Sequence, residues 1–452
     1  MSASFSEILS RSPLRLFSVL TFAICMIVLV ADGVDAQLLG IAIPVMLEDL
    51  GATRAAMGWA TGLTLVGFGL GSWSGGWLGD RIGRPWSLAL AAAIFSLGTI
   101  AASTSDNVTQ MAIWRLLGGL GFGSAYSNAI ALAGEWLPER WRSVAVTTIS
   151  VGTPAGGLIA ARYAPRLIEQ YQWQGTFVFF GIATLILCMV LVIAFLRDSP
   201  AFLLARGKKA AAEKSLRKIT DEKIDLVLES HAGDTAAGSV GVFDRSNLRM
   251  NIGVSITFTS VALVAYGILT WTTTMLTSQG FSFPQAAFAV QIAGWTSIAA
   301  AVACGMLIQR FGSKIVVLLI SISLFFALLA LGYKVETLAD VPSESEISTV
   351  TWLVGLAAAI FSAGVASNYA IMTRGYPVSC RSAGIGFGIF MARIGAVASP
   401  SLGGWLLDRG VVTFFAVLCV AAVLVSTAAF VIDTDKHVPS AKAKAKAAAY
   451  PS

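Results

Sequence analysis

The chain has 452 residues, of which 56% are apolar or aromatic and only 12% are charged. Soluble domains carry about 25% charged residues, and the long apolar runs that recur here from end to end need lipid around them, which excludes a water-soluble protein. The net charge of +6 does not indicate nucleic-acid binding, because Lys and Arg stand in short clusters between apolar runs, as in membrane proteins.

Twelve membrane-spanning helices are predicted, since a bilayer core of roughly 30 Å needs about 20 apolar residues per helix. In chain order they lie near residues 15–43, 55–78, 86–104, 108–134, 143–164, 173–196, 248–277, 285–308, 315–333, 349–373, 382–407 and 412–432. The first follows Arg11 and Arg15, as the apolar part of a signal peptide would. It is too long for one and contains Asp32 and Asp35, so a retained helix is predicted.

The polar segments divide the chain into four parts. Residues 1–196 are predicted to form an N-terminal six-helix bundle, 197–247 a partly helical cytoplasmic loop and 248–432 a C-terminal six-helix bundle. The Ala- and Lys-rich tail, residues 433–452, is expected to be disordered. The predicted fold is therefore an all-α membrane protein with twelve transmembrane helices in two bundles.

The distribution of basic residues predicts that both termini are cytoplasmic. With that orientation, 24 of the 31 Lys and Arg residues fall on the cytoplasmic side and five fall outside. Membrane proteins keep such an excess of positive charge in the cytoplasm, and we expect a multi-pass protein of a bacterial inner membrane.

The two halves resemble each other. The segment Gly76-Trp-Leu-Gly-Asp80-Arg81-Ile-Gly83 recurs 229 residues later as Gly305-Met-Leu-Ile-Gln-Arg-Phe-Gly312. Further along, Ser127-Asn128 recurs as Ser367-Asn368, and Arg142-Ser143 as Arg381-Ser382. Weak internal symmetry of this kind is typical of secondary transporters, whose substrate site lies between the two halves. The repeat predicts a pair of pseudo-symmetric bundles.

The cysteines indicate no special chemistry. There are five, four of them inside apolar runs, and none is spaced as CxxC. They are interpreted as small buried hydrophobic residues, so neither a disulfide framework nor a metal site is predicted, and no cofactor is expected.

Charged residues inside predicted spans are the strongest functional signal. An ionised side chain at the bilayer centre costs from roughly 2.5 to more than 10 kcal/mol, so such residues are expected to face a cavity and to be paired. Asp32 and Asp35 lie on one face of the first span, and Glu135 closes the fourth. Repulsion between the two aspartates, and their apolar surroundings, favour uptake and release of a proton near neutral pH. These three carboxylates are the candidates for proton coupling. The alternative is that both aspartates pair permanently with Arg115 and only hold two helices together.

Arg115 and Arg393 lie at comparable depth, one in each half. Because a guanidinium binds a carboxylate through two parallel hydrogen bonds, two arginines that face inward suit an anionic substrate. Arg115 has a purely structural alternative, an ion pair with Asp32 or Asp35. The sequence places no carboxylate at matching depth for Arg393, so substrate contact is favoured there.

Other polar and aromatic residues in the spans are weaker candidates for lining the cavity. Buried Asn and Gln often bridge helices instead, and membrane Trp often marks the interface with the headgroups. The candidates are Asn128, Asn368, Gln291, Tyr266, Trp271 and Trp295.

Two motifs resemble the signatures of the major facilitator superfamily. Gly76-x-x-x-Asp80-Arg81-x-Gly83-Arg84 is similar to its loop signature, and Arg115-x-x-x-Gly119-x-Gly121-x-Gly123 to that of its fourth helix. In the first span, Asp32-Gly-Val-Asp35-x-x-x-x-Gly40-x-x-x-Pro44 resembles the aromatic acid:proton symporter branch. The resemblance implies a major facilitator fold, transport roles for Asp32, Asp35, Arg115 and Arg393, and a gating role for Gly76, Asp80, Arg81, Gly83 and Arg84. For Arg84, a solvated positive charge at the cytoplasmic side is the alternative.

Together, the residues and the resemblance predict a monomeric importer of an aromatic or small organic carboxylate, driven by proton symport through alternating access. Its partners would be a small organic anion, protons and the lipid bilayer. The rivals are a proton-coupled effluxer of amphipathic compounds and an importer of another metabolite. An enzyme is not expected, because no span contains a nucleophile–base or metal-ligand constellation.

Overall fold

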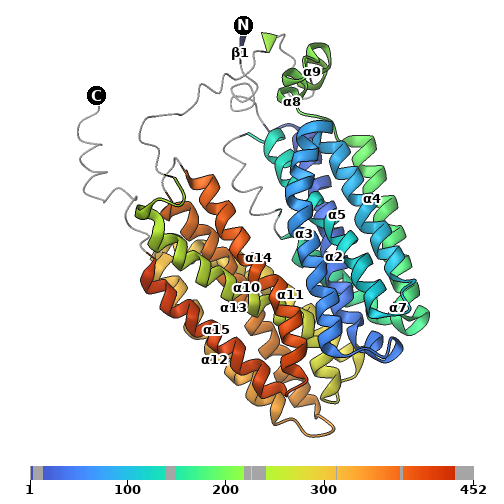
Figure 1. Cartoon of the computed structure of the whole chain (residues 1–452), viewed down its shortest axis with the longest axis vertical. Coiled ribbons are helices and arrows are strands. Elements are labelled where there is room, and N and C mark those ends of the chain that lie inside the picture. The colour runs from blue at the N-terminus through green and yellow to red at the C-terminus, as the bar shows by residue number, and fades with distance from the viewer. Residues whose placement is uncertain are drawn as a thin grey trace.

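The computed structural model of the chain describes residues 2–3, 14–138, 149, 151–217, 225–226, 241–311, 313–376 and 380–432. Long helices make up nearly all of it, in two bundles that stand side by side (Figure 1). The repeat residues Arg142, Ser143 and Gly312 and the predicted tail lie outside the described residues.

The N-terminal bundle contains the predicted spans one to six. Its helices are α2 (Leu16–Asp49), α3 (Arg54–Ile82), α4 (Arg84–Ala102), α5 (Val108–Trp136) and α7 (Gly152–Phe195). The backbone of Gln172 (φ 57°, ψ 177°) breaks α7 into two helical parts, which correspond to the fifth and sixth predicted spans. The predicted start of the fifth span, residues 143–148, lies outside the described residues.

The polar segment between the bundles is partly helical. It holds α8 (Pro200–Ala205), α9 (Lys209–Leu216) and the 3-10 helix η1 (Arg245–Asn247). The Ser199 side chain caps α8 by accepting a hydrogen bond from the Phe202 amide. Two strands of two residues each, β1 (Ser2–Ala3) and β2 (Asp225–Leu226), pair in parallel.

The C-terminal bundle contains six helices: α10 (Leu248–Ser278), α11 (Phe283–Phe311), α12 (Ser313–Glu336), α13 (Glu344–Gly375), α14 (Arg381–Leu407) and α15 (Val411–Val431). A capping box formed by Ser343 and Glu346 fixes the start of α13. Each predicted span of the second half therefore has its helix.

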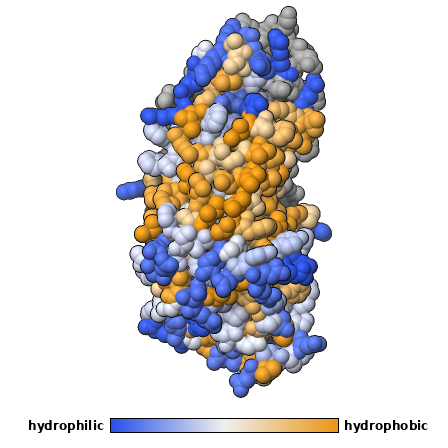
Figure 2. Space-filling view, turned by 90° about the vertical axis from the view of Figure 1, so that its right-hand side faces the viewer, coloured by the Kyte–Doolittle hydropathy of each residue, from blue (hydrophilic) through white to orange (hydrophobic). Residues whose placement is uncertain are grey.

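The helices suit a bilayer. Among the described residues, ten helices are long and apolar enough to cross a membrane, and α7 contributes two crossings. The 29-residue α3 falls outside the ten because its many glycines lower its hydropathy, and it makes the twelfth crossing. Figure 2 shows a belt of hydrophobic side chains between hydrophilic ends. The predicted all-α membrane fold is confirmed.

Glycines let the helices of the N-terminal bundle approach closely. A Cβ atom added at Gly71 of α3 would lie 2.0 Å from the carbonyl oxygen of Leu120 on α5. No larger residue fits there, and such small-residue contacts are how membrane helices pack without a hydrophobic driving force. This contact fixes α5, which carries Arg115, against α3.

The two bundles touch mainly at one end, which we call the contact end; it holds the turns at residues 50–53 and 408–410. There a single hydrophobic cluster spans both bundles, with Leu38 and Trp271 among its members. Toward the opposite end, which carries α8 and is called the α8 end, each bundle has a hydrophobic cluster of its own. The bundles accordingly diverge toward the α8 end (Figure 1).

Helices α3 and α14 form the closest seam between the bundles. A Cβ at Gly58 would lie 2.3 Å from the Pro400 carbonyl oxygen, and one at Gly404 would lie 2.4 Å from the Arg54 carbonyl oxygen. The Ser401 hydroxyl donates a hydrogen bond to the Gly58 carbonyl (3.3 Å). The two helices run antiparallel from the contact end, and this seam leads to the site between the bundles.

Candidate substrate and proton site

Arg115 of α5 and Asp35 of α2 form a buried ion pair. Arg115 donates from Nη1 to Asp35 Oδ2 (2.6 Å) and from Nη2 to Asp35 Oδ1 (3.3 Å). The Thr99 hydroxyl also donates to Asp35, and the Phe177 ring lies 5.1 Å from the guanidinium carbon. Each side chain is less than 5% exposed. Two parallel charge-assisted bonds make this a strong pair, so both charges are already compensated within the N-terminal bundle.

Asp32 lies nearly one turn earlier on α2 and has no guanidinium partner of this kind in the part of the chain that the structure describes. Its carboxylate accepts a hydrogen bond from the Thr153 hydroxyl of α7 (3.3 Å). Thr153 can come this close because Gly33 has no side chain: a Cβ there would lie 2.1 Å from the Thr153 carbonyl oxygen. The positive charge that acts on Asp32 comes from Arg393, in the other bundle. The sequence analysis treated Asp32 and Asp35 as one pair of carboxylates, whereas the structure gives them different partners.

Arg393 of α14 is only partly buried and has no carboxylate within ion-pair distance among the described residues. Its guanidinium carbon lies 3.9 Å from the ring centre of Phe68, on α3 of the opposite bundle. Its Nη1 donates a hydrogen bond to the Tyr266 hydroxyl (3.3 Å). A cation held by a ring face and a hydroxyl keeps donors free for an anion.

Aromatic side chains from both bundles gather around Arg393. The rings of Phe68 and Tyr126 lie 5.6 Å apart in the N-terminal bundle, and those of Phe258 and Tyr369 lie 5.4 Å apart in the C-terminal one. Tyr126 interacts electrostatically with Tyr369 and Arg393. The sequence analysis predicted Tyr266 but missed Phe68, Tyr126 and Tyr369. The region therefore offers an unpaired guanidinium beside rings that can stack on an aromatic ligand.

Most of the weaker candidates lie elsewhere. Asn128 is fully buried and donates from Nδ2 to the Gly75 carbonyl (2.9 Å) and the Ser87 hydroxyl (3.0 Å). Asn368 is also buried and accepts a hydrogen bond from the Thr257 hydroxyl (2.7 Å). These contacts link neighbouring helices within one bundle, so the geometry favours the bridging alternative for both.

The remaining candidates for lining the cavity are Trp271, Trp295 and Gln291. Trp271 is buried between α10 and α14 at the contact end and donates from Nε1 to the Pro400 carbonyl (3.0 Å). Trp295 is 59% exposed, and Gln291 is partly buried one turn before it on α11. None of these three makes a described contact with Arg393 or the aspartates.

The residues of the loop signature gather at the α8 end. Arg84 donates to Asp80 (2.5 Å), to Glu135 (3.2 Å) and to the Gly76 carbonyl (3.3 Å), which joins α3, α4 and α5. Arg81 lies over the ring of Trp77, 3.9 Å from its centre. Arg84 is thus a central ion-pair partner here rather than only a solvated charge. Glu135, predicted for proton coupling, lies in this group and apart from Asp32 and Asp35.

Gly83 and Asp198 tie the loop signature to the polar segment. Gly83 has a φ of 102°, and a Cβ there would lie 2.3 Å from Asp198 Oδ1. Burial, and then the repulsion of Glu135, raises the pKa of Asp198 above its ordinary value. Only glycine allows both this backbone conformation and the close approach of the carboxylate.

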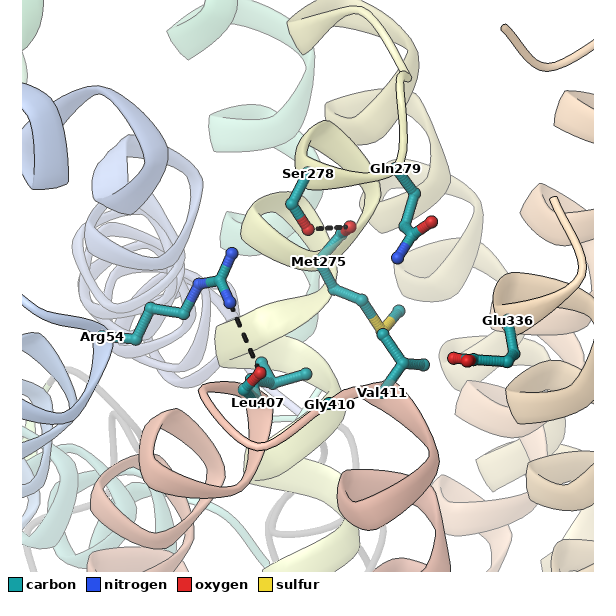
Figure 3. Close-up of a pocket in the computed structure, with 8 residues that line it drawn as sticks. All are labelled: Arg54, Met275, Ser278, Gln279, Glu336, Leu407, Gly410 and Val411. Carbon is teal, nitrogen blue, oxygen red and sulfur yellow. Dashed lines mark hydrogen bonds between the residues drawn. The ribbon is translucent and has the colours of Figure 1, made fainter. Parts of the chain in front are cut away.

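A pocket of about 300 Å³ lies at the contact end, lined by Arg54, Met275, Ser278, Gln279, Glu336, Leu407, Gly410 and Val411 (Figure 3). Arg54 crosses between the bundles and donates to the Leu407 carbonyl (3.4 Å). It also lies 3.9 Å from Asp408, but both side chains are partly exposed, so this ion pair adds little. Helix packing, rather than charge, closes this end.

Twelve crossings in two bundles, with charges buried inside apolar helices, are typical of a secondary transporter. The chain belongs to the Major Facilitator Superfamily, whose profile it matches over residues 25–333 and 254–451. The predicted family is confirmed, and with it a multi-pass membrane transporter rather than an enzyme.

The sequence identity to individual relatives is low. The chain is 27% identical to a 4-hydroxybenzoate transporter of Acinetobacter baylyi, over 96% of this chain and 95% of that one. It is 28% identical to a 3-(3-hydroxy-phenyl)propionate transporter of Escherichia coli, over 86% and 87%. The inward open xylose transporter XylE from E. coli shares the fold, with a TM-score of 0.69, 18% identity and coverage of 94% and 99%.

Proposed function

We propose that the protein imports an aromatic carboxylate together with a proton across a bacterial cytoplasmic membrane, with both termini in the cytoplasm. The observation that carries the proposal is Arg393, a mid-membrane guanidinium that has aromatic rings around it and no carboxylate partner among the described residues. An aromatic acid supplies both missing elements, a carboxylate for the guanidinium and a ring for the aromatic surroundings. Relatives named for the transport of 4-hydroxybenzoate and benzoate support the same substrate class.

The four charges of the site explain why a proton accompanies the anion. Asp35 and Arg115 neutralise each other within one bundle. Asp32 and Arg393 lie in different bundles and act on each other only through space. In the empty transporter, ionised Asp32 balances Arg393. In the loaded transporter, the substrate carboxylate binds Arg393 and a proton neutralises Asp32. The site is neutral overall in both states, whereas the anion alone would leave an uncompensated charge in the membrane.

Alternating access follows from how the bundles touch. The seam between α3 and α14 closes the contact end, while the α8 end holds separate clusters. With the α8 end in the cytoplasm, the structure is an inward-facing state. Rocking of the bundles would open the seam and close the α8 end around the same site. A membrane potential contributes about 2.3 kcal/mol per 100 mV for each net charge moved inward, so extra protons would add driving force.

The loop signature is proposed to gate the α8 end. Its ion pairs lie within the N-terminal bundle here, with Arg84 bound to Asp80 and Glu135. Such pairs hold α3, α4 and α5 as one rigid unit that moves together. A direct role for Glu135 in proton coupling stays a prediction, separate from Asp32.

The test is uptake of labelled 4-hydroxybenzoate and benzoate into proteoliposomes, with and without an inward proton gradient. We expect gradient-driven accumulation in the wild type and its loss in Arg393→Ala. Arg409→Ala is the matched control, since this exposed arginine lies over Trp405 at the contact end. Gradient-driven movement of an aliphatic acid but of no aromatic acid would contradict the substrate class. Expulsion of amphipathic compounds would show an effluxer instead.

A further inference from the structure

The seam between α3 and α14 ends at Arg393 and Phe68. From the contact end inward, the residue pairs in close contact along this seam are Gly404 with Arg54, Pro400 with Gly58 and Val397 with Gly62. The contact between Arg393 and Phe68 continues this antiparallel register and places a guanidinium against a ring face at the inner end of the seam. Beyond it, Trp73 of α3 and Phe390 of α14 are 80% and 62% exposed. Among the described contacts between α3 and α14, the cation–π contact is thus the one that lies farthest from the contact end.

We propose that the Phe68 ring binds the Arg393 guanidinium whenever no substrate is present. When the substrate enters, its carboxylate replaces the ring as the partner of Arg393. This inference rests on the proposed function, since it takes Arg393 as the group that binds the anion. Phe68 is then a positioning residue, which acts on transport through the arginine.

The reason lies in the half of the cycle in which the transporter is empty. To return outward, the unloaded protein must close both bundles around Arg393 without an anion, and a bare guanidinium in a water-poor site is costly. Asp32 compensates only through space, because no bond joins it to Arg393 in the described structure. A ring face 3.9 Å away stabilises the cation where it lies. The loaded transporter does not need the ring, because the carboxylate has replaced it.

Two transport assays separate these halves of the cycle. Net uptake driven by a proton gradient requires the empty protein to return, whereas counterflow, the exchange of labelled for unlabelled 4-hydroxybenzoate, uses only the loaded protein. For Phe68→Leu we expect net uptake to fall about tenfold, the scale of one desolvated cation–π contact, while counterflow stays close to wild type. Phe68→Tyr keeps a ring face and should restore net uptake.

Binding gives a second readout. Because the ring competes with the substrate for Arg393, Phe68→Leu should bind 4-hydroxybenzoate at least as tightly as the wild type in calorimetry. Phe430→Leu is the matched control, on a ring of α15 that is 64% exposed and should affect neither assay.

Three results would overturn the inference. They are weaker binding by Phe68→Leu, an equal fall of net uptake and counterflow, and wild-type net uptake in Phe68→Leu. The first would make Phe68 a direct stacking surface for the substrate. If the wild type moved no aromatic acid in either assay, the proposed function would fail, which is a separate outcome.

Discussion

Asp35 accepts hydrogen bonds from both terminal nitrogens of Arg115, at 2.6 and 3.3 Å, while Asp32, three residues earlier on the same helix, bonds among the described residues only to the Thr153 hydroxyl. The pair of aspartates that the sequence presents as one unit is therefore divided. Asp35 belongs to a closed ion pair within one bundle. Asp32 faces a cation in the other bundle, and we propose it as the carboxylate whose charge changes during transport.

This division predicts different effects for two conservative substitutions. Asp32→Asn mimics the protonated acid, so counterflow of 4-hydroxybenzoate should persist while gradient-driven accumulation is lost. Asp35→Asn leaves Arg115 buried without its partner, which typically costs about 3–5 kcal/mol. We expect a lower thermal unfolding midpoint in detergent, and partial recovery in the double variant Asp35→Asn/Arg115→Gln. Equal stability of the two single variants would contradict the assignment.

Gly58 is predicted to be essential for closing the contact end. In Gly58→Val the new side chain would meet the Pro400 carbonyl, where even a Cβ lies at 2.3 Å, and would force α3 away from α14. A cysteine introduced at Met57, which is fully buried beside this seam, should then react faster with a membrane-impermeant thiol reagent. Gly69→Val is the control, because no atom lies within 4 Å of a Cβ at that position. Identical labelling rates in both backgrounds would show that the seam does not close this end.

Two glycines of the loop signature should respond differently to alanine. Gly83→Ala places a Cβ on a backbone with φ of 102° and against Asp198, so we expect a loss of roughly 1–3 kcal/mol in the free energy of unfolding. Gly76→Ala meets no atom within 4 Å and lies inside α3, where alanine is the better helix former, so stability should stay equal or rise. Thermal unfolding of the two variants side by side checks the contrast. A larger loss for Gly76→Ala would be inconsistent with this packing.

Asp198 predicts a pH dependence of stability. Its pKa is raised in the folded protein, mainly by burial, so the folded state binds a proton more tightly than the unfolded one. Its contribution is therefore most favourable at low pH and is lost as the pH rises through the folded pKa. Asp198→Asn should raise the thermal unfolding midpoint at pH 7.5, and this gain should shrink toward pH 5. A gain that grows on acidification would reverse the assigned sign.

The charged part of the site could be predicted from the sequence because a charge inside an apolar run is conspicuous there. Asp32, Asp35, Arg115 and Arg393 all stand in such runs. The sequence could not predict which aspartate forms the ion pair with Arg115, because this depends on how α2 is rotated against α5. The twelve spans followed from hydropathy and length alone. Only α3 is a weak span by hydropathy, since its glycines serve packing.

The aromatic part of the site could not be predicted in the same way. Phe68 and Tyr126 are two among 25 phenylalanines and eight tyrosines, and an aromatic residue in a membrane helix carries no signal of its own. Their place beside Arg393 results from the packing of the two bundles, which brings Phe68 to a residue more than 300 positions further along the chain. Asn128 and Asn368 are the opposite case. The repeat makes them conspicuous in the sequence as candidates for lining the cavity, but in the structure both form buried hydrogen bonds between neighbouring helices.

If one proton on Asp32 accompanies one carboxylate on Arg393, substrate entry must move protons, and this movement can be measured. When 4-hydroxybenzoate is added to proteoliposomes without an imposed gradient, a pH electrode in the lightly buffered medium should record alkalinisation. The signal should be absent in Asp32→Asn, even though that variant still exchanges labelled substrate. Substrate entry without proton movement in the wild type, or an unchanged proton signal in Asp32→Asn, would contradict coupling through Asp32.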